Sequence, residues 1–176
     1  MIATQFWGKY INKVDPKFRM SLASEFRSVL KARSEAHIEL KNSENLSEKK
    51  NDGNSEAEPL RLVLTQGLGS CHIWGVPLDV WEKKIEAINT LPNTENAQEL
   101  RRHLIGGAHL CEIDKLGRML IQPSLRDYAE VEAGEEVVVL GMGETIEIWA
   151  KAMHDRTVVK KGREKSIQEF AAEHGI

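Results

Sequence analysis

Residues 14–20 read Val-Asp-Pro-Lys-Phe-Arg-Met, and residues 113–119 read Ile-Asp-Lys-Leu-Gly-Arg-Met. In each stretch a β-branched residue precedes an aspartate, and an arginine and a methionine follow after three further residues. The two stretches lie 99 residues apart. The same spacing relates three more pairs, which are Leu22 and Ile121, Phe26 and Leu125, and Arg27 and Arg126. This correspondence indicates an internal repeat.

A second correspondence follows each stretch. Leu-Val-Leu at 62–64 precedes Ile73-Trp74, and Val-Val-Val at 137–139 precedes Ile148-Trp149, now 75 residues apart. The two spacings differ by 24 residues, which is close to the length of the polar segment 34–59. The chain is therefore interpreted as two copies of one unit, the first interrupted by an insertion.

Charge is unevenly distributed along the 176 residues. The net charge of −3 argues against nucleic acid as a partner only if the chain is uniform. Residues 1–33 carry a net charge of +5, whereas 34–59 carry −4. Segment 34–59 is rich in Ser, Asn, Glu and Lys and has few apolar residues, which favours a flexible surface insertion. A solvated acidic helix is the alternative.

Each copy has the pattern of a strand, a tight turn, a short strand, a helix and a β-hairpin. In the first copy we expect strands at 7–14 and 20–22, a helix at 23–33, and hairpin strands at 60–65 and 70–74. In the second copy we expect strands at 108–113 and 119–121, a helix at 124–130, and hairpin strands at 136–140 and 145–149. Two helices, 78–89 and 94–105, are expected between the copies, and a weak amphipathic helix within 160–176. The fold class is therefore α+β and mostly β, with short helices.

Neither copy is large enough to bury both faces of its own strands. Packing the copies about a pseudo-twofold axis solves this problem. We accordingly divide the chain into a first repeat (1–76, with the insertion 34–59), a helical connector (77–107), a second repeat (108–155) and a C-terminal tail (156–176).

The two Asp-x-x-x-Arg turns carry the strongest functional signal. Asp15 and Asp114 end a strand, where an aspartate accepts hydrogen bonds from the backbone N–H groups of a turn. A reversal of this length brings Arg19 and Arg118 back beside the aspartates, which then orient the guanidinium groups. A purely structural pair is the alternative reading of one such motif. Two motifs in equivalent places, with lysines nearby, favour a paired binding surface.

These motifs resemble those of the MraZ family of bacterial transcriptional regulators, whose pattern is an apolar strand, then D-x-K-G-R, an apolar residue and a further arginine. The matching stretches are 15–20 with Arg27 and 114–123 with Arg126, and segment 100–108 is similar to the family's helix before the second repeat. The chain departs from the pattern at Phe18, which replaces glycine, and at Leu116, which replaces lysine.

The resemblance implies a small pseudo-twofold barrel of two interleaved AbrB-like swapped-hairpin repeats. It also implies ring-like homo-oligomers and binding to promoter DNA of the division and cell-wall gene cluster. The residues expected to bind DNA are Arg19, Arg118, Lys17, Lys13 and Lys115, with Asp15 and Asp114 as orienting residues. Arg27 and Arg126 are equally well interpreted as secondary DNA contacts or as members of structural ion pairs.

Other chemistry has weaker support. Cys71-His72 and His109-x-Cys111 lack the spacing of a zinc site, and no catalytic grouping occurs in both repeats, so we expect no metal, no cofactor and no enzyme. Trp74 and Trp149 are interpreted as core or interface residues. Residues 1–13 lack a secretory signal, and no apolar run has the length of a membrane span.

Together these observations predict a cytoplasmic, nucleoid-associated, sequence-specific DNA-binding regulator that acts as a homo-oligomer, with repression as the expected mode. Promoter DNA and other copies of the chain are the expected partners, and no small-molecule substrate is expected. The alternative is a protein–protein interaction module, antitoxin-like or scaffolding, built on the same barrel. A barrel that binds a small ligand is a minor alternative.

Overall fold

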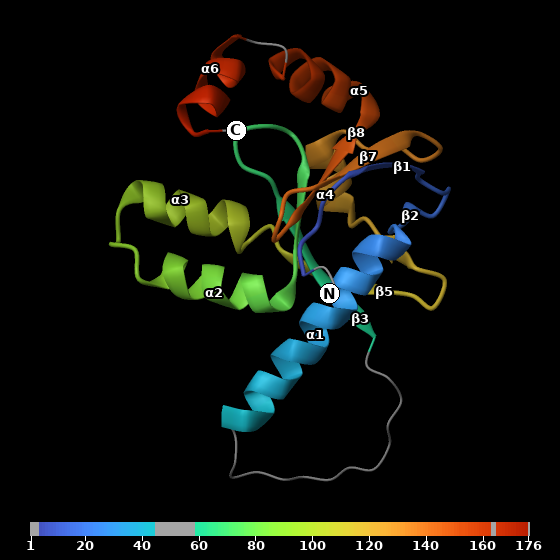
Figure 1. Cartoon of the computed structure of the whole chain (residues 1–176). Helices are drawn as coiled ribbons and strands as arrows, with labels where there is room; N and C mark the ends of the chain where they lie inside the picture. Colours follow the sequence, from blue (N-terminus) through green and yellow to red (C-terminus); the bar gives the residue numbers. More distant parts are fainter. Residues whose placement is uncertain (1–3, 45–58, 163–164, 176) are drawn as a thin grey trace.

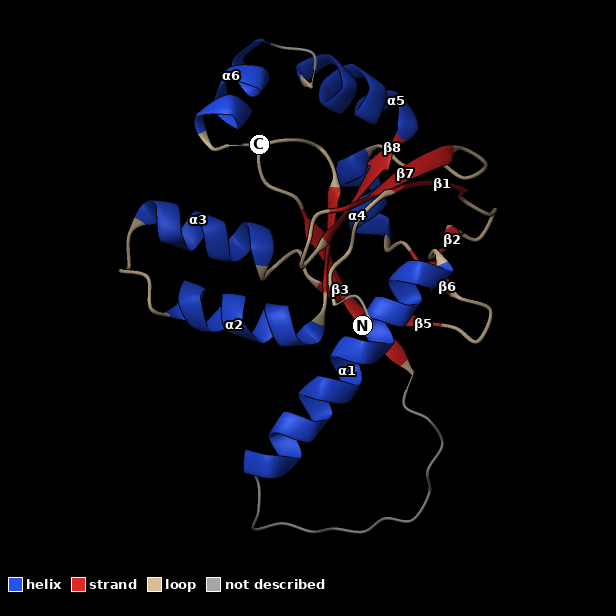
Figure 2. Cartoon of the chain, in the orientation of Figure 1, coloured by secondary structure: helices blue, strands red, loops and turns tan. Residues whose placement is uncertain are grey.

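The computed structural model describes residues 4–44, 59–162 and 165–175, which fold into an α+β architecture with central strands and peripheral helices (Figure 1; Figure 2). All of its strand pairs are antiparallel among these residues. The strands are β1 (Lys9–Lys13), β2 (Arg19–Ser21), β3 (Leu60–Gln66), β4 (Ile73–Val76), β5 (His109–Ile113), β6 (Arg118–Leu120), β7 (Glu136–Gly141) and β8 (Ile146–Ala150). The helices are α1 (Ser24–Glu44), α2 (Leu78–Asn89), α3 (Glu95–Leu104), α4 (Pro123–Ala129), α5 (Lys151–His154) and α6 (Lys165–Glu173), with the π-helical stretch η1 (Asp155–Val159) after α5.

The six-stranded sheet exchanges strands between the two halves of the sequence. Its order is β1-β7-β8-β4-β3-β5. β1 pairs with the hairpin β7–β8 from the far end of the chain, and β5 pairs with the earlier hairpin β3–β4. The two hairpins meet through β4 and β8, where Ile73 lies opposite Ile148. Each hairpin therefore receives the strand that precedes the other one.

β2 and β6 form a separate two-stranded ribbon, in which Met20 lies opposite Met119. The sequence-based expectation of a closed barrel is not met by the strand pairs of the described residues. The six-stranded order ends at β1 on one side and β5 on the other, and the short ribbon pairs only with itself. β2 and β6 have three residues each, and strands this short do not also extend the hydrogen-bond ladders of β1 and β5, which would be needed to close the sheet into a barrel.

Helix α1 is longer than the sequence-based expectation of 23–33, because it continues to Glu44. Contacts with α2 hold this extension. Arg33 Nη2 lies 2.6 Å from Asp79 Oδ2, and Glu82 accepts from Lys41 Nζ at 2.7 Å and lies 3.3 Å from His37 Nε2. For residues 34–44 the helical alternative is therefore correct. The rest of the expected insertion, 45–58, lies outside the described residues.

The connector contains the two expected helices. α2 has the predicted bounds, and α3 begins after Thr94, whose side chain accepts a hydrogen bond from the backbone N–H of Ala97. Arg101 of α3 donates to the carbonyls of Ile88 and Leu91, so the two helices lie side by side (Figure 1). α5 and η1 follow β8 directly and were not predicted.

One continuous core joins the two repeats. Phe26 of α1 is 1% exposed and packs edge-on against Phe6 and Tyr10, with ring centroids 5.3 and 4.9 Å apart. Leu125 of α4, the residue equivalent to Phe26 in the second repeat, is fully buried in the same cluster. Because equivalent residues of both repeats are buried in one cluster, the turns of the two repeats pack on the same hydrophobic core.

Candidate functional site

The first turn (15–19) and the second turn (114–118) have the same backbone hydrogen bonds. Asp15 N donates to Arg19 O at 2.9 Å, and Asp114 N donates to Arg118 O at 2.8 Å. In each turn the fourth residue also donates to the aspartate carbonyl at 2.8 Å. The sequence repeat is therefore also a repeat of local geometry.

Each aspartate braces its turn through its side chain. Asp15 Oδ1 accepts from the backbone N–H groups of Lys17 and Arg19 at 2.8 and 2.9 Å. Asp114 Oδ1 accepts from those of Leu116 and Arg118, both at 2.9 Å. In each turn, two backbone N–H groups therefore donate hydrogen bonds to the aspartate and need no acceptor from a neighbouring strand.

The other carboxylate oxygen fixes the arginine side chain. Asp15 Oδ2 accepts from Arg19 Nε at 2.8 Å and lies 2.8 Å from Nη2. Asp114 and Arg118 repeat both distances. The aspartate thus holds the edge of the guanidinium group formed by Nε and Nη2. Nη1, on the opposite edge, forms no hydrogen bond within the described residues and is available to a ligand. A positioned planar donor of this kind suits bidentate recognition of a base edge or a phosphate.

The β2–β6 ribbon brings the two arginines together. Met20 and Met119 are 1% exposed and face the core, so the alternating residues face outward. Arg19 lies opposite Leu120, and Arg118 lies opposite Ser21. The side chains of Arg19 and Arg118 are 32% and 31% exposed. One face of the ribbon therefore presents an oriented arginine from each repeat.

Phe18 adopts the backbone conformation of the glycine that it replaces. Its φ is 57°, in the left-handed region, and Gly117 in the second turn has a φ of 78°. The Arg126 guanidinium covers the Phe18 ring, with Cζ 3.6 Å from the ring centroid. Because an aromatic residue in this region is strained, the ring contacts hold a conformation that Phe18 alone disfavours.

Substitutions at Phe18 test this strain. We expect the Phe18→Gly variant to be more stable than Phe18→Ala by about 1 kcal/mol, since both lose the ring and only alanine retains a Cβ in the left-handed region. Urea unfolding of the two variants measures the difference. An alanine variant as stable as the glycine variant would show that the turn stores no such strain.

The helix of each repeat contacts the turn of the other. Arg126 of α4 covers Phe18 in the first turn, and Arg27 of α1 lies against Gly117 in the second. A Cβ on Gly117 would lie 2.8 Å from Arg27 Cζ, so glycine is required there for space as well as for conformation. The backbone contacts match, because Leu22 N donates to Gly117 O and Ile121 N donates to Phe18 O.

The structural interpretation of Arg27 and Arg126 predicted ion pairs at the helix starts. Neither side chain forms one with the described residues. Both lie beside a turn instead, and the stacking of Arg126 on Phe18 was not predicted. The sequence did indicate that Arg27 and Arg126 have matching roles, because they occupy equivalent positions of the repeat, 99 residues apart.

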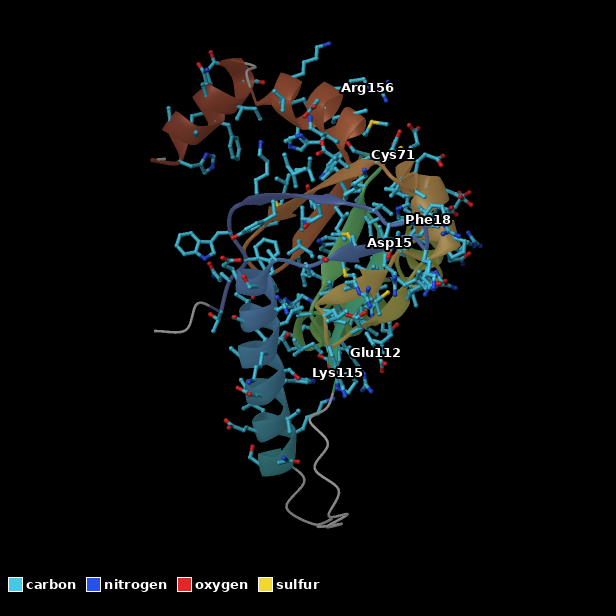
Figure 3. All side chains as sticks on the ribbon, turned by 90° about the vertical axis from the view of Figure 1, so that its right-hand side faces the viewer. Asp15, Phe18, Cys71, Glu112, Lys115 and Arg156 are labelled. Carbon is cyan, nitrogen blue, oxygen red and sulfur yellow. The ribbon has the colours of Figure 1, made fainter. Side chains whose placement is uncertain are left out.

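The three candidate lysines are exposed but occupy different places. Lys17 and Lys115 lie within the first and second turns, next to the ribbon. Lys13 ends β1 opposite Glu136 of β7 and is not part of the ribbon. Figure 3 shows Lys115 near Glu112, with Asp15 and Phe18 further up the same side of the molecule.

Hydrogen bonds lower the pKa of both turn aspartates. The backbone N–H of Arg19 is the main cause for Asp15, and that of Arg118 for Asp114. Because the folded pKa values lie below the ordinary value of 3.8, the stabilisation is complete above about pH 5. It is lost as the pH falls through 3.8 towards the folded pKa values.

We therefore expect the free energy of unfolding to decrease between pH 5 and pH 3, and to decrease less steeply in the Asp15→Asn/Asp114→Asn variant. Denaturant unfolding at a series of pH values measures both slopes, and carboxyl ¹³C titration measures the two pKa values directly. Equal slopes for the variant and the parent chain would contradict a contribution from the turn aspartates.

The cysteine and histidine candidates are dispersed. No group of three or more His, Cys, Asp or Glu side chains suited to a metal occurs among the described residues. Burial raises the pKa of the Cys111 thiol to about 11, and burial also lowers the pKa of His72, which stacks on Trp149 at 4.5 Å. Trp149 is 3% exposed, whereas Trp74 is half-buried beneath Lys84.

No helix in the described part of the chain combines the length and apolar character needed to span a membrane.

Comparison with known proteins gives one consistent result. Residues 104–173 match a family model described as "MraZ protein, putative antitoxin-like". A "Transcriptional regulator MraZ" from Pelotomaculum thermopropionicum is 34% identical over 96% of this chain and 93% of its own length. Another from Caldanaerobacter subterraneus subsp. tengcongensis is 32% identical over 93% and 92%. A third, from Desulfitobacterium hafniense, is 30% identical over 84% and 82%. The similarity thus covers both turns and both sets of strands, and the chain belongs to the MraZ family.

Proposed function

We propose that this chain is a sequence-specific DNA-binding transcriptional regulator. The observation that carries the proposal is the β2–β6 ribbon, whose outer face presents Arg19 and Arg118, each held by an aspartate. A two-stranded ribbon fits the major groove of B-DNA, and arginine is the side chain that most often recognises guanine there. The relatives are named as transcriptional regulators, which supports the same function.

In this function the residues have distinct roles. Arg19 and Arg118 contact base edges or phosphates, while Lys17, Lys115 and Lys13 neutralise the DNA backbone. Asp15 and Asp114 do not touch DNA. They hold the guanidinium groups in one orientation before binding, which reduces the conformational entropy lost on contact.

The repeats are proposed as the structural units of binding. Residues 1–76 and 108–155 form two swapped-hairpin repeats related by a pseudo-twofold axis, joined by the connector 77–107 and followed by the tail 156–176. The exchange of β1 and β5 between the hairpins supports this arrangement, as do the reciprocal contacts of each turn with the other repeat.

A single copy presents few cations to DNA, so we propose a ring-like homo-oligomer on repeated promoter sites. Linking several weak contacts raises their effective concentration and allows a chain with a net charge of −3 to bind tightly. The proposed targets are promoters of the division and cell-wall gene cluster, the proposed mode is repression, and the proposed location is the nucleoid in the cytoplasm.

The test uses the full chain and a labelled duplex from upstream of its own gene. We expect anisotropy to show binding that a scrambled duplex does not compete for, with affinity falling steeply as salt rises from 50 to 200 mM. Light scattering at several protein concentrations measures the assembly. Absence of binding at low salt would overturn the proposal and favour a protein–protein interaction module.

A further inference from the structure

A pocket lies between α1 and the second turn. It has a volume of about 720 Å³, with Arg27 and Lys31 of α1 on one side and Glu112, Asp114 and Lys115 on the other. The helix belongs to the first repeat and the turn to the second. The pocket is therefore a product of the tertiary structure, next to the ribbon that carries Arg118.

The carboxylates of this pocket already have partners. Asp114 binds Arg118 at 2.8 Å, and Glu112 Oε1 lies 3.2 Å from Arg61 Nε. The only ion pair of Lys31 among the described residues is with Glu35, at 4.0 Å between two exposed side chains, a weak interaction. The cations of the pocket are thus largely available to an added anion.

Arg27 gives an independent indication of a missing acceptor. Its Nε is buried and has no hydrogen-bond partner among the described residues. The guanidinium group packs against Gly117, which positions it at the wall of the pocket. A buried N–H donor without an acceptor is costly, and a negative charge in the pocket would offset part of that cost through its attraction to the guanidinium group that lines it.

The equivalent pocket in the other half of the molecule has the opposite charge. It lies between α4 and the first turn, has a volume of about 690 Å³, and is lined by Arg126 together with Asp127, Glu130 and Glu132. At the spacing of 99 residues Lys31 corresponds to Glu130. The same architecture therefore presents one basic and one acidic pocket beside the two turns.

We infer that the pocket formed by Arg27, Lys31 and Lys115 binds a phosphodiester group of the DNA backbone, and that the acidic pocket beside the first turn does not. The inference rests on the proposed function and adds an asymmetry to it. Both arginines of the ribbon and the turn lysines contact DNA, but the pocket beside the second turn adds a further contact with the backbone that the acidic pocket beside the first turn does not provide. One protomer therefore binds its half of a site in a single direction.

Charge exchange between the two equivalent positions tests the asymmetry. We expect Lys31→Glu to weaken binding to the promoter duplex about tenfold and to reduce the slope of log affinity against log salt by about one. Glu130→Lys is expected to strengthen binding several-fold and to make the slope steeper. The control Lys83→Glu makes the same charge change at an exposed position on α2 and is expected to leave both quantities unchanged.

The outcomes separate this inference from the proposed function. If the parent chain binds the duplex and Arg19→Ala/Arg118→Ala does not, while Lys31→Glu matches the parent, the inference is wrong and the proposed function stands. Equal losses in Lys31→Glu and Lys83→Glu, or no gain in Glu130→Lys, would also overturn the inference. A parent chain that does not bind DNA overturns both. Thermal unfolding checks that each variant folds.

A second measurement is independent of affinity. In ¹⁵N-labelled protein, the side-chain Nε–H resonance of Arg27 is expected to shift when the duplex is added, because a phosphate charge comes to lie beside its guanidinium group. Inorganic phosphate at the same ionic strength provides the comparison. A shift with phosphate alone and none with DNA would contradict a site for the DNA backbone, as would the absence of any shift.

Discussion

The Arg19→Ala/Arg118→Ala variant is expected to bind promoter DNA between about 30-fold and more than 10⁴-fold more weakly than the parent chain. The range follows from the loss of two arginine contacts, each worth about 1–3 kcal/mol of recognition. Fluorescence anisotropy at fixed salt measures the loss. Each side chain is about one-third exposed and, within the described part of the chain, forms its ion pair with its own aspartate alone, so the substitution is expected to preserve the fold.

The matched control removes two arginines away from the ribbon. Arg102 of α3 and Arg156 of η1 are exposed, and Arg156 lies far from Asp15 in Figure 3. The Arg102→Ala/Arg156→Ala variant changes the net charge by the same amount and is expected to bind DNA like the parent. Equal losses in the two double variants would mean that overall charge, not the ribbon, determines affinity.

The largest expected effect on stability is that of Phe26→Ala, at about 3–5 kcal/mol. Phe26 is 1% exposed and contacts the rings of Phe6 and Tyr10, so it joins α1 to the segment that contains β1. Alanine leaves a cavity at this junction and removes both aromatic contacts. Urea unfolding monitored by circular dichroism measures the change.

Leu40→Ala is the control on the same helix. Leu40 is 62% exposed, so its removal is expected to change the free energy of unfolding by less than about 0.5 kcal/mol. If Phe26→Ala had a similarly small effect, the packing of α1 on the β1 segment would not contribute to stability. Because the turns rest on this core, we also expect Phe26→Ala to weaken DNA binding at temperatures where it is partly unfolded.

Much of the secondary structure was predictable because its signals are local. Both Asp-x-x-x-Arg turns, the two hairpins and α2 follow from turn residues and from the spacing of apolar residues. The repeat strengthened the predictions of the turns and hairpins, since one copy supports the other. The second connector helix was expected at 94–105, and α3 spans Glu95–Leu104 with Thr94 as its N-cap, so its bounds differ by one residue at each end.

The extension of α1 was underestimated because its support is not apolar. Residues 34–44 have few large apolar side chains, and Leu40 among them is 62% exposed. Ion pairs from Arg33 and Lys41 to α2, and the contact of His37 with Glu82, hold the helix instead. A hydrophobic pattern does not report such contacts, whose partners lie more than 40 residues away in the sequence.

The amino-acid sequence was enough to recognise the two Asp-x-x-x-Arg turns, because the Asp and Arg of each turn lie within five residues of each other. It was also enough to recognise the family, because the same motif recurs with the same flanking residues. The arrangement of the two turns in space depends on the packing of the whole chain. This packing brings Arg19 and Arg118 onto one ribbon and holds Phe18 in a glycine conformation beneath Arg126. It also places a basic pocket beside the second turn and an acidic pocket beside the first. Each of these features joins residues about 100 positions apart, so local sequence signals do not report them, and the shared core determines which side chains meet.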